Sequence, residues 1–158
     1  MDDLHPNCVR INAILAEAGL PGRVRILPEA APTAVAAAEQ IGCSVGAIAN
    51  SLVFASAENE PILVLASGAH RVNTTAVASY LGTATLKRAT PEFVRAATGQ
   101  VIGGVAPIGH PAPLRTLLDV DLAQYDEVWA AGGIAHAVFA IEYGQLLKLT
   151  AAEAIEIS

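Results

Sequence analysis

The sequence contains few aromatic residues, few charged residues and no long uninterrupted apolar segment. Aromatic side chains make up 4% and charged side chains 15% of its 158 residues, whereas about 25% of residues are charged in an average globular domain. No apolar run reaches the roughly 18 residues of a membrane-spanning helix, and the opening MDDLHP lacks the basic and apolar regions of a secretory signal. We therefore expect a single cytoplasmic domain over residues 1–158 that makes no contact with a membrane.

Cysteine is also scarce, and neither cysteine nor histidine occurs in a metal-binding pattern. Cys8 and Cys43 are far apart, and the four histidines form no HExxH arrangement. In a cytosolic chain, isolated cysteines are usually reduced and behave as small apolar side chains. We expect no structural metal and no cofactor.

Basic residues are few, and they do not favour general nucleic-acid binding. The chain has nine lysines and arginines and a net charge of −6, and non-specific binding requires many phosphates to be neutralised. A small basic rim around one pocket would need only a few cations, and four lie close in sequence: Arg71, Lys87, Arg88 and Arg95. The alternative is that these are ordinary solvated surface charges.

Helical and strand-like patterns alternate along the chain. Helices are predicted over residues 7–18, 34–41, 74–81, 91–98 and 143–149, and strands over 24–27, 48–55, 62–66, 114–118, 127–131, 137–141 and 154–157. Short polar or glycine-rich turns join two pairs of neighbouring strands, which predicts hairpins. The predicted fold class is α+β, with one mixed β-sheet flanked by helices.

The segment GGVAPIGH, residues 103–110, combines three glycines with a proline and ends in a histidine. Glycine permits backbone shapes and close approaches that side chains prevent, and Pro107 fixes its own φ. A rigid wall of N–H groups could hold a carbonyl or an oxyanion, and histidine is the side chain that titrates nearest neutral pH. The alternative is a plain Gly/Pro-rich connection between two strands.

Six stretches occur in order over residues 30–150: TAVAAAEQIG (33–42), IANSLVF (48–54), LVLASGAHRVN (63–73), ATPEFVRAATG (89–99), GGVAPIGH (103–110) and YDEVWAAGG (125–133). Together they resemble the YbaK/ProX family of aminoacyl-tRNA editing domains, free-standing relatives of the editing insertion in bacterial prolyl-tRNA synthetases. The resemblance implies a curved, barrel-like mixed sheet flanked by helices. It also implies hydrolysis of the ester that joins a wrong amino acid to a tRNA. The implied partners are the 3′ aminoacyl-adenosine end of a mischarged tRNA and an aminoacyl-tRNA synthetase.

The same resemblance implies a set of site residues. The catalytic part comprises Asn50, Gly103 and Gly104, and catalysis depends on a hydroxyl of the terminal adenosine instead of a protein nucleophile. The implied substrate-binding residues are Thr33, Ser67, Gly68, Arg71, Pro107, Gly109, His110, Gly132 and Gly133. In this arrangement the glycine-rich segment holds the aminoacyl group, and the Gly132-Gly133 pair lies opposite.

Asn50 departs from the family pattern, which has a lysine in contact with the substrate's 3′ end at this position. Asparagine forms hydrogen bonds but carries no charge, so the contact loses its ionic part unless Arg71 reaches the same pocket. Val138 stands where the cysteinyl-specific branch has an acid, which points away from that branch's substrate. Two hypotheses follow: a deacylase that clears a small mischarged amino acid, and a binding module that lost turnover with the lysine. Hydrolysis of another small ester or amide stays open as a third.

Overall fold

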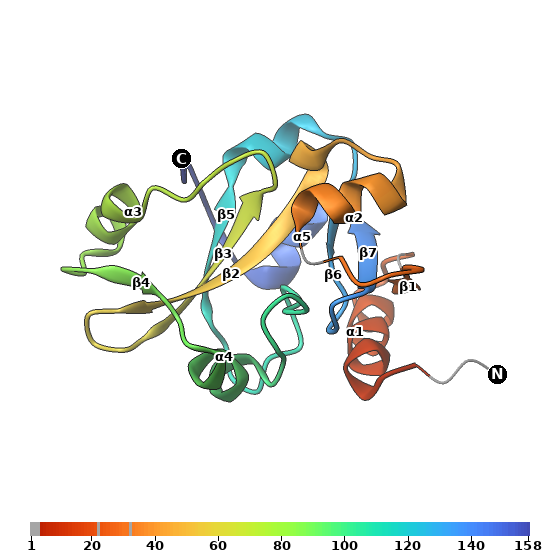
Figure 1. Ribbon diagram of the computed structural model, residues 1–158, viewed down its shortest axis with the longest axis horizontal. Helices are drawn as coiled ribbons and strands as arrows, with labels where there is room; N and C mark the ends of the chain where they lie inside the picture. The colour runs from red at the N-terminus through yellow and green to blue at the C-terminus, as the bar shows by residue number, and fades with distance from the viewer. Residues whose placement is uncertain (1–3, 22, 32) are drawn as a thin grey trace.

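The computed structural model describes residues 4–21, 23–31 and 33–158. In this part of the chain, helices surround one mixed sheet (Figure 1). The helices are α1 (Pro6–Glu17), α2 (Ala34–Ile41), α3 (Thr74–Leu81), α4 (Pro91–Thr98) and α5 (Tyr143–Thr150), with two short 3₁₀ turns, η1 (Val45–Ala47) and η2 (Val120–Gln124). The strands are β1 (Arg25–Ile26), β2 (Ile48–Ser56), β3 (Pro61–Ser67), β4 (Leu86–Arg88), β5 (Arg115–Asp119), β6 (Val128–Ala131), β7 (Ala137–Ile141) and β8 (Glu153–Ile155).

The sheet has the strand order β1-β7-β6-β2-β3-β5-β8, and β4 pairs separately with β2. The hairpins β2–β3 and β6–β7 are antiparallel, as are β1–β7 and β2–β4. The pairs β2–β6, β3–β5 and β5–β8 are parallel. The predicted mixed sheet with flanking helices is therefore confirmed.

Strand β2 has different partners along its two edges. One edge pairs with β3 from Ala49 to Ala55. The other edge pairs with β6 through Ile48 and Ala49, and with β4 through residues 54–56. Within the described chain, residues 50–52 therefore have no strand partner on this second edge, which leaves a gap in the sheet between β6 and β4.

The helix boundaries follow from local capping chemistry. The Thr33 hydroxyl accepts a hydrogen bond from the Ala36 N–H at 3.1 Å, and Gly42 ends α2 with φ of +85°. The same combination of a capping side chain and a left-handed glycine bounds α3 and α4. Each cap occupies one of the N–H groups that a helix start leaves without a partner, so these three predicted helices are confirmed.

The core is filled by aliphatic side chains on both faces of β3. Leu63 and Leu65 belong to the larger core, which also contains Phe139 and residues of α1 and α5. Ile62 and Val64 belong to a second core beneath α3. Because side chains alternate between the faces of a strand, β3 supplies both cores. None of the helices in the described ranges has the length and apolar character needed to cross a bilayer.

Three elements were not predicted: β4 and the two 3₁₀ turns. Strand β4 spans three residues, and its Lys87 and Arg88 are exposed. Its pattern is too short and too polar to stand out from a loop. It forms only because the far end of β2 offers an unpaired edge.

Candidate functional site

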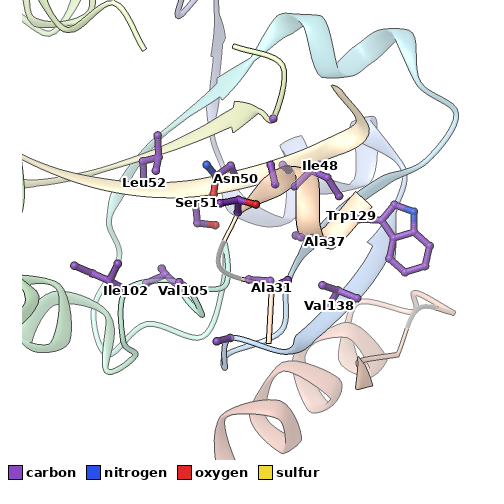
Figure 2. A pocket seen from close by; sticks show the side chains of 18 of the residues that line it. Ala31, Ala37, Ile48, Asn50, Ser51, Leu52, Ile102, Val105, Trp129 and Val138 are labelled. Atoms are coloured by element: carbon purple, nitrogen blue, oxygen red, sulfur yellow. The ribbon is translucent and has the colours of Figure 1, made fainter. Parts of the chain in front are cut away.

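A pocket opens at the gap between β6 and β4 (Figure 2). Its volume is about 590 Å³, within the range of about 300–1,000 Å³ that is usual for small-molecule sites. Asn50, Ser51 and Leu52, which lack a strand partner on this edge of β2, line it. The remaining walls come from the start of α2, the segment after β3, Arg88 of β4, residues 102, 103 and 105, β6 and β7.

Much of the pocket wall consists of methyl groups. The alanines that line it are Ala31, Ala34, Ala37, Ala49, Ala130, Ala131, Ala135 and Ala137. Larger apolar side chains, among them Ile48 and Val138, complete this surface, and Trp129 is its single aromatic residue. A wall of this kind accommodates a small apolar group and offers it no polar partner.

The charges of the lining are all positive. No lining residue is acidic, and two are arginines, Arg71 and Arg88. In the described part of the chain neither arginine forms an ion pair. The Arg88 guanidinium lies over the Phe54 ring, 5.7 Å from its centroid, a favourable cation–π arrangement. The pocket of this acidic chain is therefore suited to an anionic group.

Three polar groups of the pocket lack partners among the described residues. The Asn50 side chain is exposed and forms no hydrogen bond, and Figure 2 shows it beside Ser51. The Ser51 hydroxyl is buried and is also without a partner. The Gly103 N–H takes part in none of the backbone hydrogen bonds found there. Unpartnered buried polar groups are rare in folded proteins, so the Ser51 hydroxyl indicates a place for a ligand or water. The exposed Asn50 amide and Gly103 N–H can also bond to such a group.

Five of the residues expected from the sequence come together at this pocket: Thr33, Asn50, Gly68, Arg71 and Gly103. Thr33 is at the same time the cap of α2. Gly68 allows a close approach, because a Cβ at this position would lie 2.4 Å from the Val45 carbonyl oxygen. Arg71 and Asn50 share one pocket, as the replacement of the family lysine by an arginine would require.

The other expected residues lie outside the lining. The chain turns inward after Gly103, because Val105, Ala106 and Ile108 belong to the core. Gly104 packs so closely on the backbone of Ile134 that a Cβ would lie 2.6 Å from it. Pro107 is buried within the same inward-turning segment. The expectation that the whole segment 103–110 forms the pocket wall is corrected: only its beginning does.

The end of that segment faces helix α1. The Gly109 carbonyl accepts a hydrogen bond from Arg10 Nε at 2.9 Å, and His110 Nε2 lies 2.8 Å from the Ala106 carbonyl oxygen. Burial lowers the pKa of His110, against the hydrogen bond to Ala106, which raises it. His110 is therefore a neutral side chain with a structural hydrogen bond at this position, away from the pocket lining.

Three further expected residues do not line the pocket but pack in the structure around it: Ser67, Gly132 and Gly133. The Ser67 hydroxyl is buried and donates to the Gly46 carbonyl at 2.8 Å. Gly132 and Gly133 are buried, and a Cβ on Gly133 would lie 2.7 Å from Asn7 of α1. The turn between β6 and β7 thus lies against α1, and neither Gly132 nor Gly133 lines the pocket.

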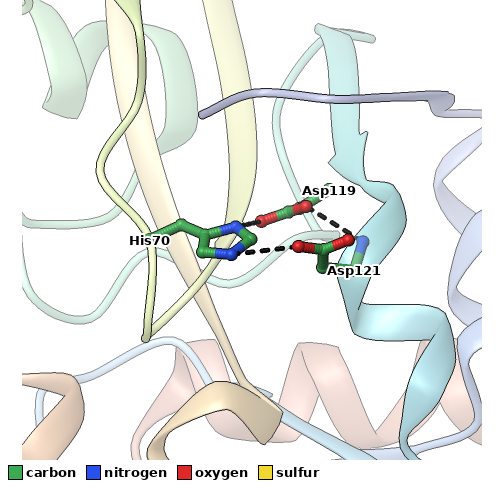
Figure 3. Close-up of side chains that lie close together, drawn as sticks. All are labelled: His70, Asp119 and Asp121. Atoms are coloured by element: carbon green, nitrogen blue, oxygen red, sulfur yellow. Dashed lines mark hydrogen bonds and ion pairs between the residues drawn. The ribbon is translucent and has the colours of Figure 1, made fainter.

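A cluster of His70, Asp119 and Asp121 lies next to the site and was not predicted (Figure 3). His70 Nδ1 is 2.8 Å from Asp119 Oδ2, and Nε2 is 3.0 Å from Asp121 Oδ2. Asp119 is 1% exposed and also accepts hydrogen bonds from the Ser67 and Asp121 N–H groups, both at 3.0 Å. Among the described residues, this is the one group of three histidine, cysteine or carboxylate side chains that could surround a metal ion. Both ring nitrogens of His70 already face carboxylate groups.

The sequence contained a partial signal for two pocket residues that were missed. Arg88 was grouped with nearby cations but was not assigned to the site, since its position depends on β4. Ser51 follows Asn50 directly, yet alternation along a strand would place the two on opposite faces. Asn50 and Ser51 both line the pocket because β2 has no neighbouring strand on this edge at residues 50–52.

The fold agrees with comparisons to known proteins. The family described as "Aminoacyl-tRNA editing domain" matches residues 28–149. This match covers most of the chain, so the chain belongs to that family, and the resemblance noted from the sequence is confirmed.

Several relatives are connected with prolyl-tRNA synthetase. A crystal structure of a candidate trans-editing enzyme for prolyl tRNA synthetase superimposes with a TM-score of 0.91 and 40% identity, over 99% of both chains. Proline–tRNA ligase of Nitratidesulfovibrio vulgaris (strain DP4) is 32% identical over 120 residues, which are 76% of this chain and 19% of that protein. The uncharacterized protein YwhH of Bacillus subtilis (strain 168) is 34% identical over 97 residues, 61% of each chain. The chain thus corresponds to about a fifth of the ligase and to somewhat less than two thirds of YwhH.

Proposed function

We propose that this protein is an aminoacyl-tRNA deacylase that hydrolyses the ester of a small amino acid wrongly attached to a tRNA. The observation that carries this proposal is the composition of the pocket: a wall of alanines beside two unpaired arginines, with no acid in the lining. An aminoacyl-tRNA 3′ end presents a small side chain, an ester and neighbouring phosphodiesters. The pocket has a complementary surface for each of these parts.

Arg71 and Arg88 are assigned to the phosphates of the 3′ end. Guanidinium groups bind phosphate through charge-assisted hydrogen bonds, which are roughly twice as strong as neutral ones. Because the chain carries a net charge of −6, attraction to RNA would be confined to this pocket and would not extend over the surface. These two cations take over the role for which the family uses a lysine at the position of Asn50.

The unpartnered polar groups are assigned to the ester. Hydrolysis develops negative charge on the carbonyl oxygen, and fixed hydrogen-bond donors stabilise that charge. The Gly103 N–H and the Asn50 amide are donors without other partners in the described chain, and the Ser51 hydroxyl can position water. In the family, a hydroxyl of the terminal adenosine assists the attack, so a protein nucleophile is not required.

A deacylation assay over a panel of mischarged tRNAs tests the proposal. Wild-type protein is expected to release small amino acids faster than the spontaneous rate. Arg71→Ala and Arg88→Ala are expected to raise KM, since each removes a charged contact to the RNA. Arg95→Ala is the matched control, because Arg95 is an exposed arginine of α4 that does not line this pocket.

Two outcomes would contradict the assignment. An equal change in KM for Arg88→Ala and Arg95→Ala would contradict the role of the pocket arginines. Binding of mischarged tRNA without any turnover would replace the deacylase with the other hypothesis, a binding module in which Asn50 has abolished catalysis.

A further inference from the structure

The residues between β3 and α3 carry part of the pocket wall. Gly68 and Arg71 belong to this segment and line the pocket. Its two ends are held by backbone hydrogen bonds donated by the Gly68 N–H, at 2.8 Å, and the Asn73 N–H, at 2.6 Å. The N–H groups of Arg71 and Val72 form none of the hydrogen bonds found in the described chain. The position of Arg71 therefore depends on its neighbours.

His70 is the neighbour that is fixed most firmly. Its two ring nitrogens lie 2.8 Å from Asp119 and 3.0 Å from Asp121. The ring is therefore held from two sides, by one carboxylate group at each nitrogen. Asp119 is itself buried and held by the Ser67 N–H. The imidazole ring thus joins the β3–α3 segment to the end of β5 and the start of η2.

We propose that His70 is a positioning residue: its contacts with Asp119 and Asp121 fix the segment after β3 so that Arg71 faces the pocket. This inference rests on the proposed function, because it assigns Arg71 to the RNA. Arg71 is exposed and has no partner of its own among the described residues. Its backbone, which His70 holds from the preceding position, therefore determines where the guanidinium can reach. Arg71 is placed before the ligand arrives, and less ordering remains to be done on binding.

Asp121→Ala is the informative change. His70→Ala would leave the buried Asp119 carboxyl group without its side-chain partner, which destabilises folded proteins. Asp121 is half-exposed, with 50% of its side chain accessible, so its removal releases one side of the ring and leaves the pair with Asp119 intact. Asp126→Ala is the matched control, since it removes an exposed carboxylate from the same region that has no contact with His70.

The experiment measures the Kd of a fluorescent acceptor-stem RNA with a free 3′ end, together with the thermal midpoint of each variant. Asp121→Ala is expected to raise Kd by about fivefold, a coupling of ordinary size for residues with shared partners. In an Arg71→Ala background the same change is expected to have no further effect. Asp126→Ala is expected to leave Kd unchanged or to lower it, because it removes a charge that repels RNA.

The signs of these effects separate positioning from general electrostatics. Tighter binding by Asp121→Ala, or an equal effect with and without Arg71, would overturn the role of His70. No binding of the RNA to wild type would overturn it as well. Non-additive binding effects combined with no deacylation would leave the positioning role in place and overturn the proposed deacylase alone.

Discussion

Gly104 offers the sharpest test of which glycines in segment 103–110 serve packing. A Cβ on Gly104 would lie 2.6 Å from the Ile134 backbone carbon atoms and 2.8 Å from the Ala135 nitrogen. Backbone atoms cannot rotate away, so Gly104→Ala must displace the turn between β6 and β7 or the segment itself. Overpacking of this kind costs about 1–3 kcal/mol. For a chain of this length, that corresponds to a fall in the thermal midpoint of about 2–12 °C.

Gly144→Ala provides the matched control. A Cβ at Gly144 meets nothing within 4 Å, and the residue lies within helix α5. Alanine is favoured over glycine in helices by about 0.5–1 kcal/mol, so this variant should be at least as stable as wild type. The measurement is thermal and urea unfolding followed by circular dichroism. A Gly104→Ala midpoint equal to that of Gly144→Ala would refute the close packing of Gly104 on Ile134.

Two further predictions concern single side chains. Asn50→Lys places a cation on an exposed position of the pocket wall, so we expect tighter binding of acceptor-stem RNA and a stability within about 0.5 kcal/mol of wild type; strong destabilisation would contradict the exposure of Asn50. Hydrogen bonds lower the pKa of Glu153 from 4.5 to about 2. The bond from Arg115 is the largest cause, and the bond from Tyr80 is the next. The stability contributed by this carboxylate is therefore present above about pH 4.5 and is lost as the pH falls towards 2. Arg115→Ala should return the Glu153 titration, followed by NMR, towards its ordinary value, and an unchanged titration would refute the assigned cause.

The parts of the fold that could be predicted are those determined by residues close together in the sequence. Thr33 and Gly42 mark the ends of α2 through contacts within the helix itself. The hairpin β2–β3 follows from two apolar runs joined by a short polar turn. Such signals do not depend on the rest of the molecule, so the sequence alone is sufficient to read them.

The parts of the site that were missed depend on contacts between distant segments. Arg88 reaches the pocket only because β4 pairs with the free end of β2. His70 meets Asp119 because β3 and β5 are parallel neighbours. The inward turn after Gly103 depends on the place that the core offers to Val105 and Ile108. Family motifs indicated that this segment matters, but they did not distinguish the residues that face a ligand from those that face the core.

The gap beside residues 50–52 means that the entrance to the pocket is part of the framework of the protein. Seven consecutive residues of β2 are paired with β3 behind the gap, and β6 and β4 are held on its two sides by their own ladders with β2. A ligand can therefore enter the pocket without the opening of a lid or the separation of two strands. Much of the wall that limits the size of the ligand consists of strand backbones and alanine methyl groups, which have almost no rotamer freedom. Replacing an alanine in the pocket wall by a larger residue narrows the range of ligands that fit, so small changes in side-chain volume there adjust selectivity.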